Sequence, residues 1–325
     1  MPEQVTRLRA VWVRVTSSPW YRIVQIMALG LAIGLMLRVL VLGILQLDMA
    51  NLQFDFASLG IGLLLTWLAF YLGTFAWAEI VRAIHPAVPY FQAIEYHLLS
   101  VAAKYLPGVG WYQVSKAVQL YRGGVPASQI PLTVALEVAL IVLTGLATAF
   151  EILSLASQTV LALSFDLQLG VAFVLLMMCA LLPWAVLRLI NRGPVSRISA
   201  RGLVLHLYLA ELLDTIGWLT FGLAFWFIIR ALGPLGLDAL PYCIATLALS
   251  VVAGLAVIVV PNGYGIRELT MSTLLQAILP ISSSIVIAIV SRIVLVAAEF
   301  LGVLPVILRI GRRVAREQLP GVNKR

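Results

Sequence analysis

Six apolar stretches, each long enough to cross a lipid bilayer, limit what this chain can fold into. They cover residues 23–45, 59–84, 130–156, 167–190, 203–229 and 282–310. A helix of about 20 apolar residues spans the hydrocarbon core of a bilayer. Only 11% of the 325 residues are charged, whereas soluble domains carry about a quarter. The sequence therefore predicts an all-α polytopic membrane protein in which residues 1–325 form a single membrane domain.

Two further apolar stretches are interrupted by proline and glycine. Residues 91–122 break at Pro107-Gly108, and residues 241–280 break at PNGYG, residues 261–265. Proline removes a backbone donor and glycine adopts conformations that end helices. The piece before the first break is about 15 residues, or about 22 Å of helix, which is too short to cross. We expect two re-entrant hairpins; the alternative is two kinks in ordinary membrane helices.

The basic residues fall on one side of this layout. With six crossings, 18 of the 22 lysines and arginines lie on the side of the N-terminus, whereas the loops at 46–58 and 151–166 carry acids and no base. Loops rich in lysine and arginine lie in the cytoplasm. We therefore expect a multi-pass protein of the cell (plasma or inner) membrane with both termini cytoplasmic. The formal charge of +8 belongs to these loops and does not indicate nucleic-acid binding.

The order of the segments repeats along the chain. Residues 59–156 give a crossing, a broken hairpin and a crossing, and residues 203–310 give the same order after one linking crossing. A single linking helix inverts the second half relative to the first. Paired interrupted helices in inverted halves point to a transport site. The predicted fold is six full transmembrane helices plus two re-entrant broken-helix hairpins in an inverted repeat.

Polar residues cluster at and near the two breaks. In each hairpin the second helix begins at the break, so its free N–H groups and positive dipole end point into the membrane and attract anions. Charges at this depth are costly and should face a cavity or one another. We expect a substrate-binding site formed by Lys104, Tyr105, Pro107, Gly108, Trp111, Gln113, Glu137, Asn262, Gly263, Gly265, Arg267, Glu268, Arg292 and Glu299.

Some of these charges have a purely structural alternative. Arg292 precedes Glu299 by seven residues on one helical face, so the two can form an ion pair. A second candidate pair is Arg267 with Glu137. We expect Glu211 and Asp214, which share a face of the fifth crossing, to form a secondary site that is either held neutral or open to a wet vestibule.

Chemistry-bearing motifs of enzymes do not occur in the sequence. The three histidines and two cysteines lack metal-ligand spacing, and there is no Walker loop, G-x-S-x-G motif or zinc helix. We expect no cofactor, no metal and no catalytic residue. A membrane transferase that uses one isolated carboxylate stays open, because such an enzyme needs no motif.

The broken segments resemble those of a known family. KYLPGVGWYQVSK (104–116), YRGGV (121–125), a crossing with Glu137, PNGYGIRE (261–268) and Arg292, in this order, are similar to the membrane region of lysylphosphatidylglycerol synthases. That family includes stand-alone flippase-like membrane proteins, and the resemblance covers nearly the whole chain. Asn262 stands where the family often has glycine, and Lys116 where arginine is common.

The resemblance implies movement of a polar, phosphate-bearing lipid between leaflets. Members with a soluble aminoacyl-transfer domain place it after the membrane region, and this chain ends 15 residues after its last predicted crossing. We therefore do not expect it to synthesise lysyl-lipids. The expected partners are an anionic or phosphate-bearing lipid and the bilayer, with a second copy of the chain or a lipid-modifying enzyme as further candidates. The alternatives are a transferase acting on a polyprenyl phosphate or glycolipid, with Glu137, Asp214 or Glu268 as base, and a membrane scaffold.

Overall fold

The described part of the chain is helical throughout. The computed structural model describes residues 54–105, 110–158, 163–191, 199–257, 263 and 265–317, and these ranges contain no strand. The helices are α3 (Phe56–Ile84), α4 (Tyr90–Ala103), α5 (Trp111–Arg122), α6 (Ile130–Leu155), α7 (Phe165–Asn191), α8 (Ala200–Arg230), the 3₁₀ turn η1 (Leu237–Ala239), α9 (Leu240–Ala256), α10 (Ile266–Leu275) and α11 (Ile281–Glu317).

Six of the described segments are long and apolar enough to cross a membrane, as expected for a multi-pass membrane protein. Five of them, formed by α3, α6, α7, α8 and α11, match predicted crossings. The remaining predicted crossing, 23–45, lies outside the described residues. The sixth candidate is Leu237–Ala256, which consists of η1 and α9.

Both predicted interruptions separate two helices. The first break falls between α4 and α5, and the second falls between α9 and α10. Pro107, Gly108 and Asn262 themselves lie outside the described residues. At helical rise, α4, α5 and α10 are about 21, 18 and 15 Å long, so none of them reaches across a 30 Å core. The segment of η1 and α9 is about 30 Å long and does reach across. The re-entrant path of each hairpin therefore stays a prediction.

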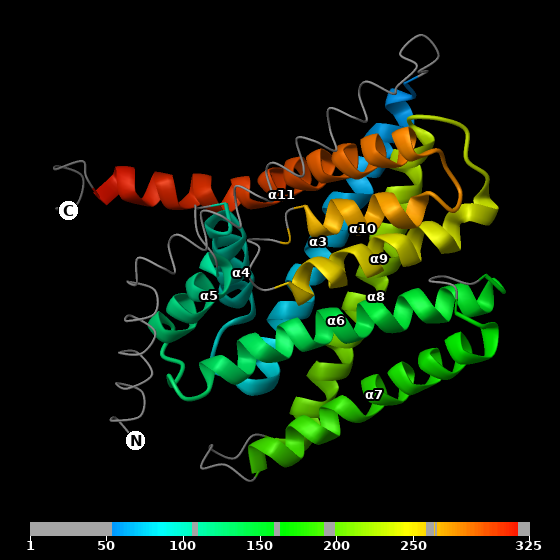
Figure 1. Ribbon diagram of the computed structural model, residues 1–325. Helices are drawn as coiled ribbons and strands as arrows, with labels where there is room; N and C mark the ends of the chain where they lie inside the picture. The colour runs from blue at the N-terminus through cyan, green and yellow to red at the C-terminus, as the bar shows by residue number, and fades with distance from the viewer. Residues whose placement is uncertain are drawn as a thin grey trace, which may run out of the picture.

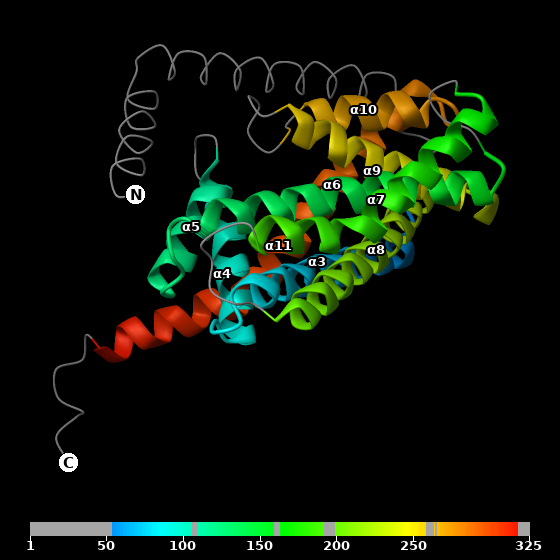
Figure 2. The same ribbon diagram turned by 90° about the horizontal axis from the view of Figure 1, so that it is seen from below.

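The two long helices α3 and α8 lie side by side on one face of the bundle and pack along much of their length (Figures 1 and 2). Glycines allow the close approach. A Cβ atom at Gly62 of α3 would lie 2.9 Å from Ile228 and 3.2 Å from the carbonyl of Ala224, both on α8. Small residues at such crossings are the usual basis of helix packing in membranes.

The other helices pack against this pair and against one another. α6 packs between α7 and α9, and α11 packs on α3, α4 and α10. Figure 1 shows α7 at the lower edge of the bundle and the C-terminal part of α11 extending to the left, beyond α4. The outward face of α7 exposes large apolar side chains, among them Phe173, Leu181 and Trp184. A face of this kind suits contact with lipid rather than water.

Polar contacts fix both ends of α3. The Asp55 carboxylate accepts hydrogen bonds from the N–H groups of Ala57 and Ser58, at 3.0 and 3.2 Å. The Ser58 hydroxyl also donates to it, and this hydrogen bond is the main cause of the lowered pKa of Asp55. At the other end, His85 Nε2 lies 2.8 Å from Thr133 Oγ1 of α6, and burial lowers the pKa of His85 to about 4. A neutral imidazole therefore joins α3 to α6.

Glycines with positive φ begin both helices that follow a break. The N-cap of α5 is Gly110, with φ of 83°, and the N-cap of α10 is Gly265, with φ of 82°. Gly263, with φ of 63°, packs against α9, where an added Cβ would lie 2.7 Å from the Cα of Gly254. Because only glycine tolerates both this φ and this contact, Gly263 fixes how α10 folds back on α9.

We predict that Gly263→Ala destabilises the protein. A side chain at positive φ costs about 1–2 kcal/mol, and the clash with the backbone of Gly254 adds to it. Gly170→Ala is the matched control, because a Cβ at that position of α7 meets nothing within 4 Å. Thermal unfolding in detergent measures both variants. Equal melting temperatures for the two would contradict the packing of the second break.

Candidate functional site

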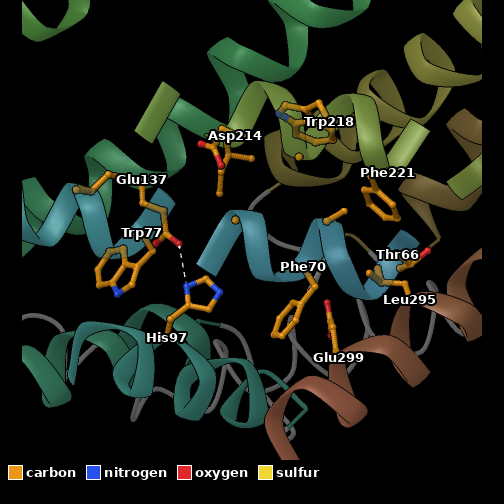
Figure 3. A pocket seen from close by; sticks show the side chains of 15 residues that line it. Thr66, Phe70, Trp77, His97, Glu137, Asp214, Trp218, Phe221, Leu295 and Glu299 are labelled. Atoms are coloured by element: carbon orange, nitrogen blue, oxygen red, sulfur yellow. Dashed lines mark ion pairs between the residues drawn. The ribbon is translucent and has the colours of Figure 1, made fainter. Parts of the chain in front are cut away.

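A cavity of about 190 Å³ lies between helices that are far apart in the sequence. Its lining comes from α3, α4, α6, α8 and α11, and it is large enough for several waters, since one water needs roughly 10–15 Å³. Figure 3 shows the aromatic and acidic side chains that surround it. The polar and aromatic lining residues are Thr66, Phe70, Trp77, His97, Glu137, Asp214, Trp218, Phe221 and Glu299.

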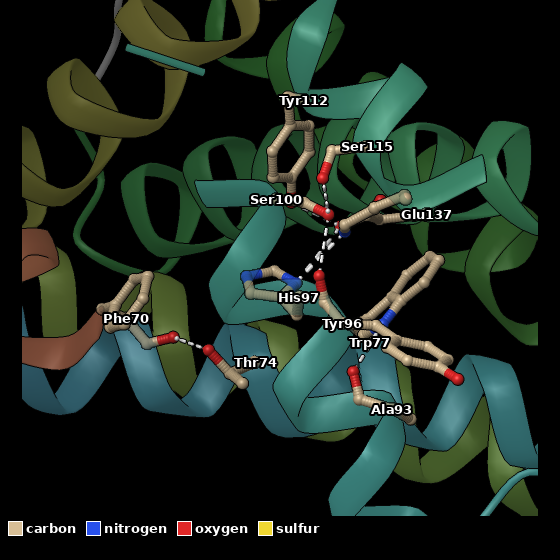
Figure 4. A network of polar contacts seen from close by, with 11 residues as sticks. Phe70, Thr74, Trp77, Ala93, Tyr96, His97, Ser100, Tyr112, Ser115 and Glu137 are labelled. Atoms are coloured by element: carbon tan, nitrogen blue, oxygen red, sulfur yellow. Dashed lines mark hydrogen bonds and ion pairs between the residues drawn. The ribbon is translucent and has the colours of Figure 1, made fainter. Parts of the chain in front are cut away.

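Glu137 of α6 is the centre of a buried polar cluster at one end of the cavity. Its carboxylate pairs with the ammonium of Lys116 from α5 and accepts a hydrogen bond of 2.8 Å from the Tyr112 hydroxyl. His97 Nδ1 of α4 lies 3.8 Å from the same carboxylate oxygen. Figure 4 shows His97, Tyr112 and Glu137 converging from three helices. This cluster joins the short helices α4 and α5 to the long helix α6.

The Lys116 side chain is fully buried, and its ammonium group is enclosed. Its Nζ atom lies 3.7 Å from the centre of the Trp77 ring and 4.3 Å from that of the Tyr112 ring, which are cation–π distances. It also lies 3.1 Å from His97 Nδ1. Because an ammonium only donates, this nitrogen of His97 accepts, and the imidazole is neutral.

Glu299 of α11 is the centre of a second cluster. Its Oε1 lies 2.5 Å from Lys104 Nζ, and its Oε2 accepts a hydrogen bond from the Tyr105 hydroxyl. Lys104 is the C-cap of α4, so this contact joins the first broken segment to the second half of the chain. Glu299 also lines the cavity, and Figure 3 shows it apart from Glu137.

Glu268 stabilises the start of α10. Its Oε2 accepts a hydrogen bond of 2.7 Å from the backbone N–H of Gly265, which satisfies a donor that the helix leaves free. Its Oε1 lies 3.7 Å from Arg292 Nε of α11. Glu268 therefore both caps the helix after the second break and ties that helix to α11.

Arg267 is a buried base without a carboxylate at ion-pair distance among the described residues. Only 7% of its surface is exposed, and its guanidinium carbon lies 5.6 Å from the centre of the Phe221 ring. Within the described residues, no carboxylate oxygen comes within 4.0 Å of it. The residue stands in the first turn of α10, where free N–H groups and the helix dipole also favour an anion.

The observed ion pairs differ from the two that the sequence suggested. Glu299 pairs with Lys104 rather than with Arg292 on its own helix, and Glu137 pairs with Lys116 rather than with Arg267. Sequence spacing identified residues on one helical face. It did not identify contacts between helices, because those depend on how α4, α5 and α10 fold back against α6 and α11.

Glu211 and Asp214 on α8 are both buried, and each has one oxygen without a hydrogen-bond partner in the part of the chain that the structure describes. Asp214 lines the cavity, as Figure 3 shows. Glu211 does not contribute to the lining. The two residues predicted as one secondary site therefore differ: Asp214 faces the shared cavity with Glu137 and Glu299.

The remaining predicted site residues lie away from the cavity lining. Trp111 is 42% exposed and Gln113 is exposed, both in the first turn of α5. Gly263 and Gly265 shape the second break. Among the described residues, no group of three or more His, Cys, Asp or Glu side chains is arranged to hold a metal ion.

Sequence analysis missed four residues of the Glu137 cluster: Trp77, His97, Tyr112 and Lys116. The sequence placed Lys116 among the bases that flank or lie in the first broken stretch, and the structure buries it completely. The signal was present in the spacing: Tyr112 and Lys116 are four residues apart and therefore share a helical face. The sequence did not show that both contact the same carboxylate, that of Glu137, which lies 21 residues after Lys116.

We predict that Lys116→Met destabilises the protein, because it leaves the Glu137 carboxylate buried without its cation. Breaking a buried pair in this way costs roughly 3–5 kcal/mol. Adding Glu137→Gln should restore much of the loss. Arg122→Gln, at an exposed base of the same helix, is the control. Thermal unfolding that is equal for Lys116→Met and Arg122→Gln would rule out the buried pair.

No protein-family model and no curated protein matches this chain.

Proposed function

We propose that this protein is a flippase-like lipid transporter that moves a phosphate-bearing polar lipid between the leaflets of a membrane. The single observation that carries this proposal is Arg267, a buried cation at a helix N-terminus beside a membrane-depth break, with no carboxylate partner among the described residues. A buried charge of this kind needs a counter-ion. A lipid phosphate is an anion that reaches this depth while its tails stay in the bilayer.

The contacts between helices support an inverted repeat. We pair α3 with α8, α4 with α9, α5 with α10 and α6 with α11. Under this exchange, the contact of α6 with α9 corresponds to that of α11 with α4, and the contact of α3 with α11 corresponds to that of α8 with α6. The contacts of α3 with α4, α4 with α5 and α5 with α6 likewise correspond to those of α8 with α9, α9 with α10 and α10 with α11. The helices α3 and α8, which correspond to each other, are in contact.

Ion pairs follow the same correspondence with the charges exchanged. In the first half Lys116 of α5 pairs with Glu137 of α6, and in the second half Glu268 of α10 pairs with Arg292 of α11. Both pairs hold the helix after a break against the last helix of its half. Together with the positive-φ glycine at the start of each of these helices, they support halves 59–156 and 203–310 as repeats.

In this proposal the head group binds beside the second break. Its phosphate contacts Arg267 and the free N–H groups of α10, and Lys104 and Arg292 lie within electrostatic range of Arg267. The pair of Lys104 with Glu299 links the two halves, so rocking of one half against the other changes this contact and alternates access to the site.

The proposed orientation follows from the loops. Lys104 and Lys116 take part in pairs with buried carboxylates and give no loop charge, so 16 of the 22 bases remain on the N-terminal side of the proposed layout. We place that side, with both termini, in the cytoplasm of a cell (plasma or inner) membrane.

We predict opposite labelling of two introduced cysteines. Ala127 lies in the loop between α5 and α6, which the layout places in the cytoplasm, and Leu237, 70% exposed, lies at the start of the α9 segment, which it places outside. In a background with Cys179→Ala and Cys243→Ala, a membrane-impermeant maleimide added outside should modify Leu237→Cys only. Modification of both positions from the same side would overturn the layout.

We predict that Arg267→Gln weakens binding of a phosphate head group and leaves the fold intact. A charge-assisted contact contributes roughly 1.5–3 kcal/mol, so its loss should weaken binding by about 10- to 150-fold. Native mass spectrometry of co-purified lipid, together with thermal unfolding, measures both effects. Arg201→Gln, at an exposed base of α8, is the control. A stable Arg267→Gln protein with normal lipid retention and flux would reject the anion site.

The second candidate is a transferase that acts on a polyprenyl phosphate or a glycolipid. The unpartnered oxygen of Asp214, which faces the cavity, favours it because a catalytic base needs such an oxygen. Proteoliposomes with labelled lipid separate the candidates. Net movement of unchanged lipid supports the transporter, and a new covalent product supports the transferase.

A further inference from the structure

The charges around the cavity do not balance if every carboxyl is ionised. Glu137 is neutralised by Lys116, and Glu299 is neutralised by Lys104. His97 is neutral, because its Nδ1 accepts from the ammonium of Lys116. Asp214 is therefore the lining carboxyl to which no described base is assigned.

The surroundings of Asp214 add no cation. It is 8% exposed, and its Oδ2 has no hydrogen-bond partner among the described residues. The groups that face it from the elements around it are mostly acidic or neutral, and the nearby base already serves Glu137. Around it lie Glu211 of α8, Glu137 of α6, and Lys116 and Tyr112 of α5, and the same cavity is lined by His97 of α4 and Glu299 of α11. Trp77 of α3 also lines the cavity, and the one carboxylate of α3, Glu79, pairs with His206. Cys179 of α7 lies near Glu211.

An ionised Asp214 would be an uncompensated charge inside the membrane, next to the carboxylate of Glu137. Two carboxylates that share one site do not both ionise readily. A protonated Asp214 removes the charge and offers an O–H donor to the cavity, where Glu137 Oε2 is also without a described partner. Figure 3 shows the Asp214 and Glu137 side chains at the same end of the cavity.

We propose that Asp214 is a proton-binding site of this cavity. The proton comes from water on the side to which the cavity is open, forms an O–H bond on the carboxyl of Asp214, and returns to water when Asp214 ionises. In its link to transport the inference rests on the proposed function, because the proton would then travel with the change in access. The proton site itself requires only the cavity and its carboxyls.

Infrared spectroscopy of the full-length protein tests this assignment. In an ester-free detergent at pH 7, the wild type should show a protonated-carboxyl band that shifts in D2O. The difference spectrum between the wild type and Asp214→Asn should contain one negative carboxyl band, and Asp214→Glu should move that band. Asp238→Asn, at an exposed aspartate of η1, should leave it unchanged.

Thermal unfolding of the same variants gives an independent readout. Asn resembles a protonated Asp, so Asp214→Asn should melt at the wild-type temperature at pH 7, whereas Glu137→Gln should melt lower because it strands Lys116. An unchanged carboxyl band or an unfolded Asp214→Asn protein would overturn the proton site. Absent lipid flux with an intact band would refute the proposed transport and not this site.

Discussion

The cost of a charge in a medium of low dielectric constant determines where the broken helices of this protein lie. Lys116 is completely enclosed and is stable there because the Glu137 carboxylate, the Trp77 and Tyr112 rings and His97 surround its ammonium. Short helices such as α4 and α5 lack the length that anchors a membrane span. Their ion pairs and aromatic contacts with long helices supply that anchoring. The same reasoning applies to α10, which Glu268 caps at Gly265 and ties to Arg292.

Two halves with corresponding contacts place these anchored helices around one cavity. Glu137 of the first half and Glu299 of the second half both line it, and each receives a lysine and a tyrosine hydroxyl from the first broken segment. A change at that segment therefore acts on both halves at once. In the proposed transport mechanism, this coupling would allow one half to rock against the other at the α3–α8 contact, where Gly62 keeps the two helices close.

The long helices and the two breaks could be predicted from the sequence because hydropathy and length are local properties. Five of the predicted long apolar helices and both interruptions are confirmed where the structure describes them. The partners of the buried charges could not be predicted, because Lys116 and Glu137 are joined by folding rather than by spacing. A base at the edge of an apolar stretch has the same sequence signature whether it faces water or a carboxylate. The α9 segment shows another limit: the sequence predicts a re-entrant hairpin for residues 241–280, yet the segment before the break is long enough to cross.

An experimental structure of the full-length protein in lipid nanodiscs tests the central claim most directly, by showing what neutralises Arg267. The proposed function predicts density for a lipid phosphate at the guanidinium of Arg267 and the first N–H groups of α10, with acyl chains leading into the bilayer. A protein carboxylate within ion-pair distance of Arg267, with no lipid at that position, would contradict it.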